Sequence, residues 1–197
     1  MSDSTVLAET DLRDFFRKEV TRAIDHLKVE TDEFTTFYLV NLLAEFGATE
    51  ELYEDADRPL ALIYGKAMES NGPERVRILK KLGDFALYIS GYFSDSLQNK
   101  AVDVDYYIAM GSNAYGSVSR LMRAQPRGDV FGPVFQELSG KFPSYVDVLN
   151  EVSDNTAAGN ATDRDVMRLY EIWSRTKSKR CEALLRKMGM VLEGGSQ

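Results

Sequence analysis

Apolar side chains recur at steps of three and four residues along almost the whole chain, and this spacing limits what the chain can fold into. Near the N-terminus, Leu12, Phe16 and Val20 form one such series. Residues at this spacing lie on one face of an α-helix, whereas a half-buried strand requires alternation, which no stretch of this sequence shows. The sequence therefore predicts an all-α fold.

Capping and turn residues divide this pattern into separate helices. Either Thr31 or Asp32 is a candidate N-cap, and Pro73 follows Asn71-Gly72 as a helix-starting proline. The expected helices span residues 10–28, 32–47, 59–70, 73–97, 105–124, 130–139, 143–152 and 162–190. With 197 residues, 44% of them hydrophobic, the chain can bury one core. We expect a compact bundle of seven to eight helices in a single domain, with residues 1–9 and 191–197 frayed.

Composition excludes several classes of function. The net charge of −7 disfavours a nucleic-acid binder, because such proteins need cations for the phosphate backbone. The longest apolar run is too short to span a bilayer. Cys181 is the single cysteine, so no intramolecular disulfide can form, as is typical of a reducing compartment. The N-terminus lacks the pattern of a signal peptide, and we expect a cytoplasmic protein.

Two central segments carry a resemblance. The sequences GDFALYISGYF, from Gly83, and VDVDYYIAMGSNAYGS, from Val102, are crowded with tyrosine, glycine and serine. They resemble a pattern found in uncharacterised bacterial all-helical proteins. The resemblance implies a bacterial, cytoplasmic, helical protein, and it transfers no functional residue.

With a single histidine, the chain cannot build several common metal and catalytic sites. Zinc proteases need two histidines four residues apart, and di-iron bundles need a Glu-x-x-His motif from each of two helices, so His26 alone supports neither. Cys181 has basic neighbours but no base near it in sequence. Asp103 and Asp105 are better explained as helix-capping acids than as metal ligands. We therefore predict no catalytic residue, no metal and no cofactor.

Glycines inside the two central helices need an explanation. An internal glycine costs a helix roughly 1 kcal/mol relative to alanine. Gly83 lies in the first segment, and Gly111 and Gly116 lie in the second. Two explanations compete, either close approach of neighbouring helices or a cavity for a ligand. Close packing is the commoner cause and the favoured one.

Polar residues also follow helical spacing on these two helices. If the two faces meet, hydroxyl, carboxylate and amide groups gather inside the bundle, as either a satisfied structural network or the wall of a ligand pocket. The candidate ligand-binding residues are Asp84, Tyr88, Tyr92, Tyr106 and Asn113.

The last predicted helix is basic. We expect its apolar face, including Val166, Tyr170 and Trp173, to pack on the bundle and its cations to face outward. The candidate partner-binding residues are Arg175, Lys179, Arg186 and Lys187. A solvated face without a partner is the simpler interpretation.

These observations predict a non-enzymatic helical binding or regulatory module that acts through protein–protein contacts, with either a partner protein or a second copy. The alternative is a protein that binds a small apolar ligand in a pocket between the two central helices. An enzyme that works without histidine at that pocket ranks below both.

Overall fold

The computed structural model is all-helical, as the sequence predicts. It describes the backbone of residues 2–48, 59–92, 103–123 and 128–157, and shorter pieces between residues 166 and 191. Side chains are described within residues 12–46, 59–92, 103–123 and 131–156 and at the C-terminal pieces. Across these residues the chain forms seven α-helices and one π-helical turn, and no strand.

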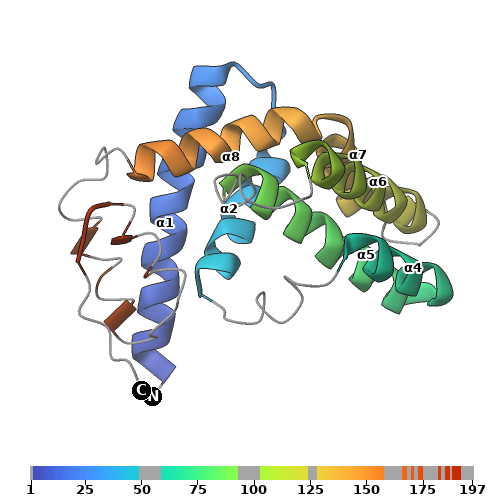
Figure 1. Ribbon diagram of the computed structural model, residues 1–197, viewed down its shortest axis with the longest axis horizontal. Helices are drawn as coiled ribbons and strands as arrows, with labels where there is room; N and C mark the ends of the chain where they lie inside the picture. The colour runs from blue at the N-terminus through green and yellow to red at the C-terminus, as the bar shows by residue number, and fades with distance from the viewer. Residues whose placement is uncertain are drawn as a thin grey trace.

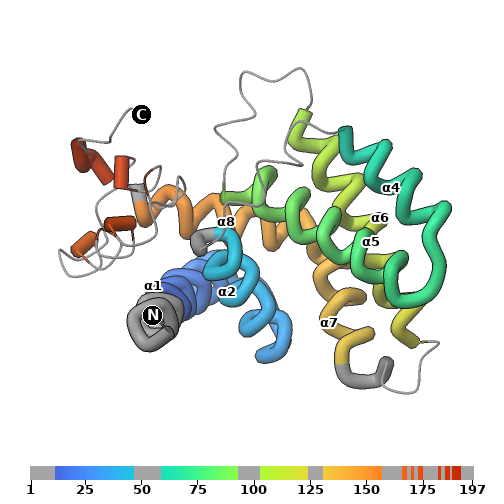
Figure 2. Tube along the Cα trace, turned by 90° about the horizontal axis from the view of Figure 1, so that it is seen from below, coloured from blue at the N-terminus to red at the C-terminus, as the bar shows by residue number. Residues whose placement is uncertain are grey.

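The helices pack as one bundle (Figure 1). In chain order they are α1 (Ser2–Leu27), α2 (Glu33–Ala48), α4 (Leu60–Glu69), α5 (Gly72–Leu87), the π-helical turn η1 (Tyr88–Tyr92), α6 (Val104–Arg123), α7 (Gly128–Gly140) and α8 (Phe142–Ala157). The pairs α1–α2, α4–α5, α5–α6 and α6–α7 are neighbours in space as well as in sequence. Helix α8 contacts α1 and η1, so it connects the two sides of the bundle (Figure 2).

Local sequence explains most helix boundaries. The backbone N–H of Phe34 donates to the Asp32 carboxylate at 2.8 Å, which confirms Asp32 as the cap of α2. Pro59 precedes the first turn of α4, and Pro73 lies in the first turn of α5. Helix α1 begins at Ser2, well before the expected start near Thr10.

The long central helix differs from its prediction. We expected one α-helix over residues 73–97, but the α-helical pattern changes to a π-helical turn at Tyr88. Inside that turn, the Ser90 hydroxyl donates to the Ala86 carbonyl at 2.7 Å, a bond to the backbone that often bends helices. Helix α8 also extends to Ala157, beyond the expected end at residue 152. Residues 93–102 and the turn expected at 125–128 lie largely outside the described residues.

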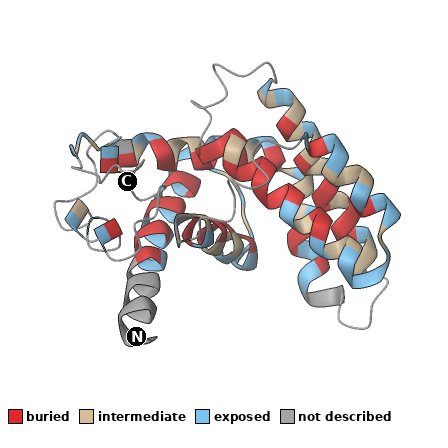
Figure 3. Cartoon of the chain, turned by 60° about the horizontal axis from the view of Figure 1, so that its bottom comes forward, coloured by how far each residue is buried: buried red, intermediate tan, exposed pale blue. Residues whose placement is uncertain are grey.

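The core lies where all these helices converge (Figure 3). Its largest fully buried side chains are aromatic, with Tyr92, Tyr115, Tyr145, Phe16 and Phe142 all below 2% exposure. Burying such rings supplies much of the stabilisation of a domain this size. Within the described part of the chain, no helix is both long enough and apolar enough to cross a membrane.

The last predicted helix is described only in pieces. Trp173 is buried and Tyr170 lies against it, with ring centroids 5.6 Å apart. Tyr170 itself is 38% exposed, so it packs less deeply than expected. Leu185 is fully buried, and Arg186 is exposed.

Candidate functional site

The glycines of the central helices mark places where helices approach each other closely. A Cβ at Gly83 would lie 2.6 Å from the Tyr115 ring, and one at Gly91 would lie 2.6 Å from Cβ of Leu149. A Cβ at Gly111 would overlap the Phe142 ring. Real Cβ atoms essentially never come this near a neighbour, so these positions need glycine for packing. The close-packing explanation therefore accounts for them: Gly83 lies where α5 meets α6, Gly91 where η1 meets α8, and Gly111 where α6 meets α8.

Asp84 is the centre of a buried polar cluster, which we call the Asp84 cluster: Asp84, Tyr38, Tyr115 and Lys80. The Tyr115 hydroxyl donates to Oδ1 of Asp84 at 2.8 Å, and the Tyr38 hydroxyl donates to the same oxygen. Nζ of Lys80 donates to Oδ2 at 2.7 Å and also lies 5.2 Å from the centre of the Tyr38 ring. The cluster thus ties α2, α5 and α6 together.

Both tyrosines of this cluster act as hydrogen-bond donors and keep their protons. Burial raises the pKa of Tyr115 well above its ordinary value, and the negative charge of Asp84 raises it further. The pKa of Tyr38 is raised by the same two causes in the same order. Neither hydroxyl ionises near neutral pH, so each one keeps the proton that it donates to the carboxylate.

The structure does not gather the five predicted ligand-binding residues at one place. Asp84 is buried, but Asn113 is exposed, so the expected shared interior is wrong. Tyr106 accepts a hydrogen bond from the backbone N–H of Ala61 at 3.1 Å, near the start of α4. Helix α6 turns Tyr107, Gly111, Ala114, Tyr115 and Val118 inward, which is a face about 100° from the one predicted.

Tyr88 and Tyr92 are buried in an aromatic part of the core. Their rings stack with centroids 5.6 Å apart. Phe46 lies 4.4 Å from the Tyr88 ring, and Phe16 lies 6.0 Å from the Tyr92 ring, both measured between centroids. These two tyrosines therefore belong to the packing between α1, α2 and η1.

A groove opens next to the Asp84 cluster, on the side of α5 away from α6. We call it the α2–α5 groove, and its volume is about 1100 Å³. Its walls come from α2, α4, α5 and α7, and no α6 residue lines it, so it is not the pocket predicted between the two central helices. The apolar lining residues are Phe34, Phe37, Leu42, Phe46, Leu62, Ile63, Ile78, Leu82, Phe85, Phe131 and Val134.

Four large apolar side chains of the groove face solvent. Leu62 is 69% exposed, Phe34 is 66% exposed, and Phe37 and Phe131 are each 58% exposed. They come from three different helices that meet around one groove. A cluster of exposed aromatic and aliphatic side chains is typical of interaction sites, whereas single exposed apolar residues need no explanation.

Glu137 of α7 holds the start of α2 in place beside this groove. Its carboxylate accepts from the Thr35 hydroxyl at 2.6 Å, from Nζ of Lys141 at 3.0 Å and from the backbone N–H of Asp32 at 3.3 Å. Burial opposes ionisation, but the hydrogen bonds from Thr35, Lys141 and Asp32 outweigh it and lower the pKa of Glu137. Glu137 thus stays ionised at neutral pH and keeps Phe34 and Phe37 positioned.

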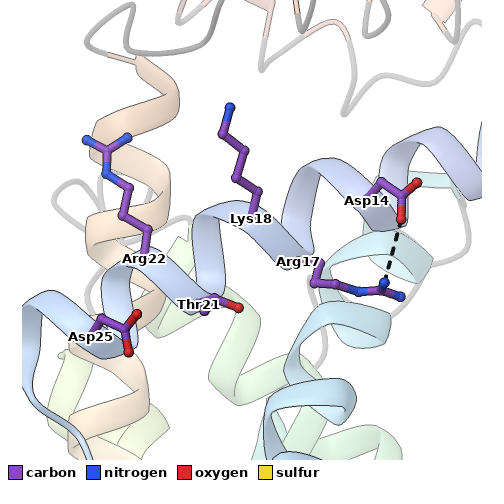
Figure 4. Close-up of a pocket in the computed structure, with 6 residues that line it drawn as sticks. All are labelled: Asp14, Arg17, Lys18, Thr21, Arg22 and Asp25. Atoms are coloured by element: carbon purple, nitrogen blue, oxygen red, sulfur yellow. Dashed lines mark ion pairs between the residues drawn. The ribbon is translucent and has the colours of Figure 1, made fainter.

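The outer face of α1 carries a shallow polar depression that contrasts with the groove (Figure 4). Lys18 and Arg22 extend away from the helix, and Arg17 lies 3.9 Å from Asp14. Such exposed pairs contribute little energy. On the neighbouring part of α1, His26 Nδ1 lies 3.0 Å from Glu151 of α8 in an exposed contact. This face has the character of an ordinary solvated surface.

Of the four predicted partner-binding cations, the structure describes the side chain of Arg186 alone. Arg186 is exposed and pairs with Glu182, four residues earlier in the sequence, at 2.7 Å. Arg175, Lys179 and Lys187 lie outside the described residues, as does Cys181. No group of three or more metal-ligating side chains occurs among the residues that the structure describes.

Sequence reasoning missed Tyr38, Tyr115, Lys80 and the exposed phenylalanines. The inward face of α6 was recognisable from Tyr107, Gly111 and Val118, which recur at helical spacing. No comparable signal brings α2 beside α5, since that contact joins distant parts of the chain.

Comparison with known proteins finds no matching family model, no similar curated protein and no similar solved structure. The groove and the Asp84 cluster are therefore the features from which a function can be inferred.

Proposed function

We propose that this protein is a non-enzymatic binding module that recognises a partner protein through the α2–α5 groove. The observation that carries the proposal is the set of exposed side chains Phe34, Phe37, Leu62 and Phe131 around that groove. Aromatic side chains that become buried against a partner contribute most of the energy at many interfaces. A groove with an apolar floor also fits the common mode in which an amphipathic segment lies between helices.

The Asp84 cluster favours binding over catalysis. A catalytic carboxylate needs a free oxygen or a proton to transfer, but Asp84 accepts bonds from two hydroxyls and one ammonium group. The raised pKa values of Tyr38 and Tyr115 keep both hydroxyls protonated, so they are weak acids and neither supplies a phenolate base at neutral pH. We assign the cluster a structural role, which is to fix α5 and α2 as walls of the groove.

The cellular setting is part of the proposal. The single cysteine is consistent with a reducing, cytoplasmic environment, and the sequence resemblance suggests a bacterial source. A small apolar ligand is the rival occupant, because the groove floor is apolar.

A fluorescent apolar probe tests whether the groove is a recognition site. We expect 8-anilinonaphthalene-1-sulfonate to bind the folded protein saturably and the variant Phe37→Asp to bind it about tenfold more weakly. Full burial of such a side chain contributes about 1.5–3 kcal/mol, and about 1.4 kcal/mol corresponds to a factor of ten in affinity. The measurement is a fluorescence titration at equal protein concentration.

The matched control is Met167→Asp, because Met167 is also 58% exposed but does not line the groove. This variant should bind the probe like the unmodified protein. Equal loss in both variants, or no loss in Phe37→Asp, would show that the groove is not the apolar recognition site.

A further inference from the structure

The cations of the groove lie on one side of it. Lys66 comes from α4, and Arg77, Lys80 and Lys81 come from α5, whereas Glu45 is the acid supplied by α2. The whole chain carries a net charge of −7, so a positive wall departs from its general character. A surface with one sign of charge attracts the opposite sign and steers its approach.

Two of these four cations already have close partners. Nη2 of Arg77 lies 2.6 Å from Oε1 of Glu74, and Nζ of Lys80 lies 2.7 Å from Asp84. Lys66 and Lys81 form no ion pair with any side chain that the structure describes.

Glu74 is shared among several cations. Its pKa is lowered first by the hydrogen bond from Arg77, against the effect of burial, and then by the charges of Arg77, Lys66 and Lys81. The lining has four cations and two acids, Glu45 and Asp84, and with Glu74 counted as a third acid the surplus beside the groove is one positive charge.

The α2 wall of the groove is apolar apart from Tyr38, Asn41 and Glu45, and further apolar residues of α4, α5 and α7 also line the groove. Phe34 and Phe37 are one turn apart on α2, and Leu42 and Phe46 continue the same wall toward the end of the helix. The stretch from Phe34 to Phe46 covers roughly 18 Å at about 1.5 Å per residue. An occupant that contacts the whole wall is therefore about three helical turns long.

The open rim of the groove favours a peptide over a small molecule. The groove volume of about 1100 Å³ lies close to the upper end of the range of about 300–1,000 Å³ that is typical of small-molecule pockets, so volume alone does not decide between the two occupants. Small-molecule sites also enclose most of their ligand, but here the aromatic rim extends into solvent. Rim side chains at 58–69% exposure become buried only when the occupant covers them from outside.

We infer that the α2–α5 groove binds an acidic amphipathic helix of a partner protein, with its apolar face on Phe34, Phe37 and Phe131 and its acidic flank beside Lys66 and Lys81. This inference rests on the proposed function and adds the chemistry of the partner. It also assigns an orientation, since the four cations lie on α4 and α5, whereas the exposed phenylalanines lie on α2 and α7.

Three stapled helical peptides test the inference. Each has about 14 residues, enough at about 1.5 Å per residue to follow the α2 wall, and all share one apolar stripe of leucine and phenylalanine. Their flanks carry glutamate, glutamine or lysine. Fluorescence anisotropy should show that the glutamate peptide binds most tightly at low salt. Its advantage in affinity over the other two peptides should be smaller at physiological salt, because salt screens the charges.

Charge reversal on the protein should change that ranking. We expect the double variant Lys66→Glu/Lys81→Glu to bind the glutamate peptide at least about tenfold more weakly and to prefer the lysine peptide, because like charges now face each other. The control Arg13→Glu makes the same change of charge at an exposed position of α1 that does not line the groove, and it should leave the ranking unchanged. Circular dichroism checks that each variant stays helical.

The outcomes separate this inference from the proposed function. If all three peptides bind equally and Phe37→Asp weakens them all, the groove is a protein-binding site but the acidic partner is wrong. If dodecanoate binds the groove and no peptide does, the occupant is a small amphiphile and the inference is overturned. If nothing binds in a manner sensitive to Phe37→Asp, both proposals fail.

Discussion

Replacing Asp84 by alanine is expected to lower the free energy of unfolding by roughly 2–3 kcal/mol. The substitution removes the acceptor of three donors, and a buried donor left without a partner costs about 1–3 kcal/mol. Tyr115 is fully buried, so water cannot replace the lost carboxylate there, whereas Lys80 is part-exposed and regains solvent. For a chain of this length the melting temperature should fall by about 2–4 °C per kcal/mol.

Denaturant unfolding of Asp84→Ala, Tyr115→Phe and the double variant measures this coupling. If the two groups support each other, the double variant loses less stability than the sum of the two single variants. A protein that is unchanged or stabilised by Asp84→Ala would contradict the structural role. That result would indicate that the Asp84 carboxylate is buried at a cost in stability, as is common at functional sites. Asp84 would then be a candidate catalytic residue.

The second large effect concerns Gly83, which faces the Tyr115 ring. We expect Gly83→Ala to destabilise the protein by up to about 2 kcal/mol. An added methyl group in a packed core forces its neighbours to move at a cost of about 1–3 kcal/mol, and alanine returns about 1 kcal/mol in a helix interior. The new Cβ would lie 2.6 Å from two carbons of a ring that has no exposed surface. Urea unfolding gives the value.

Gly65 provides the matched control. It lies inside α4, and a Cβ there would meet nothing within 4 Å. Gly65→Ala should therefore show the propensity gain alone and stabilise the protein by about 0.5–1 kcal/mol. If both substitutions stabilise the protein, the close approach of α5 and α6 is wrong, and with it the account of why this segment contains glycine.

The sequence predicted the helices well because their causes are local. Apolar spacing, the Asp32 cap and the prolines at residues 59 and 73 act over only a few residues. The π-helical turn at Tyr88 was not predicted, and Gly91 within it packs closely against Leu149, which is far away in the sequence. Long-range contacts of this kind leave no periodic signal.

The candidate site was predicted less well for a related reason. Asp84 was recognised as a polar residue at a buried position, and the structure confirms that it is buried. Its partners were misassigned because the polar stripe through Asn113 was taken as the inward face of α6, although the aromatic and small residues define that face. Exposed phenylalanines cannot be recognised from spacing, because a phenylalanine in a helical sequence ordinarily predicts burial.

The groove is therefore a feature of the tertiary structure. Phe34 and Phe131 are far apart in the sequence, and they line one groove only because the Glu137 and Asp84 contacts hold α2 beside α7 and α5. We propose that this groove is open in the free protein and is filled by a helical partner.

Fluorine NMR of the protein labelled with 4-fluorophenylalanine tests that claim most directly. Phe37 and Phe131 should show the solvent isotope shift of exposed rings in the free protein and should move when the glutamate peptide is added. Phe142 has no exposed surface, so its resonance should show no solvent isotope shift and should not move when the peptide is added. Resonances of Phe37 and Phe131 that resemble that of Phe142 in the free protein, or that stay in place at saturating peptide, would contradict the account.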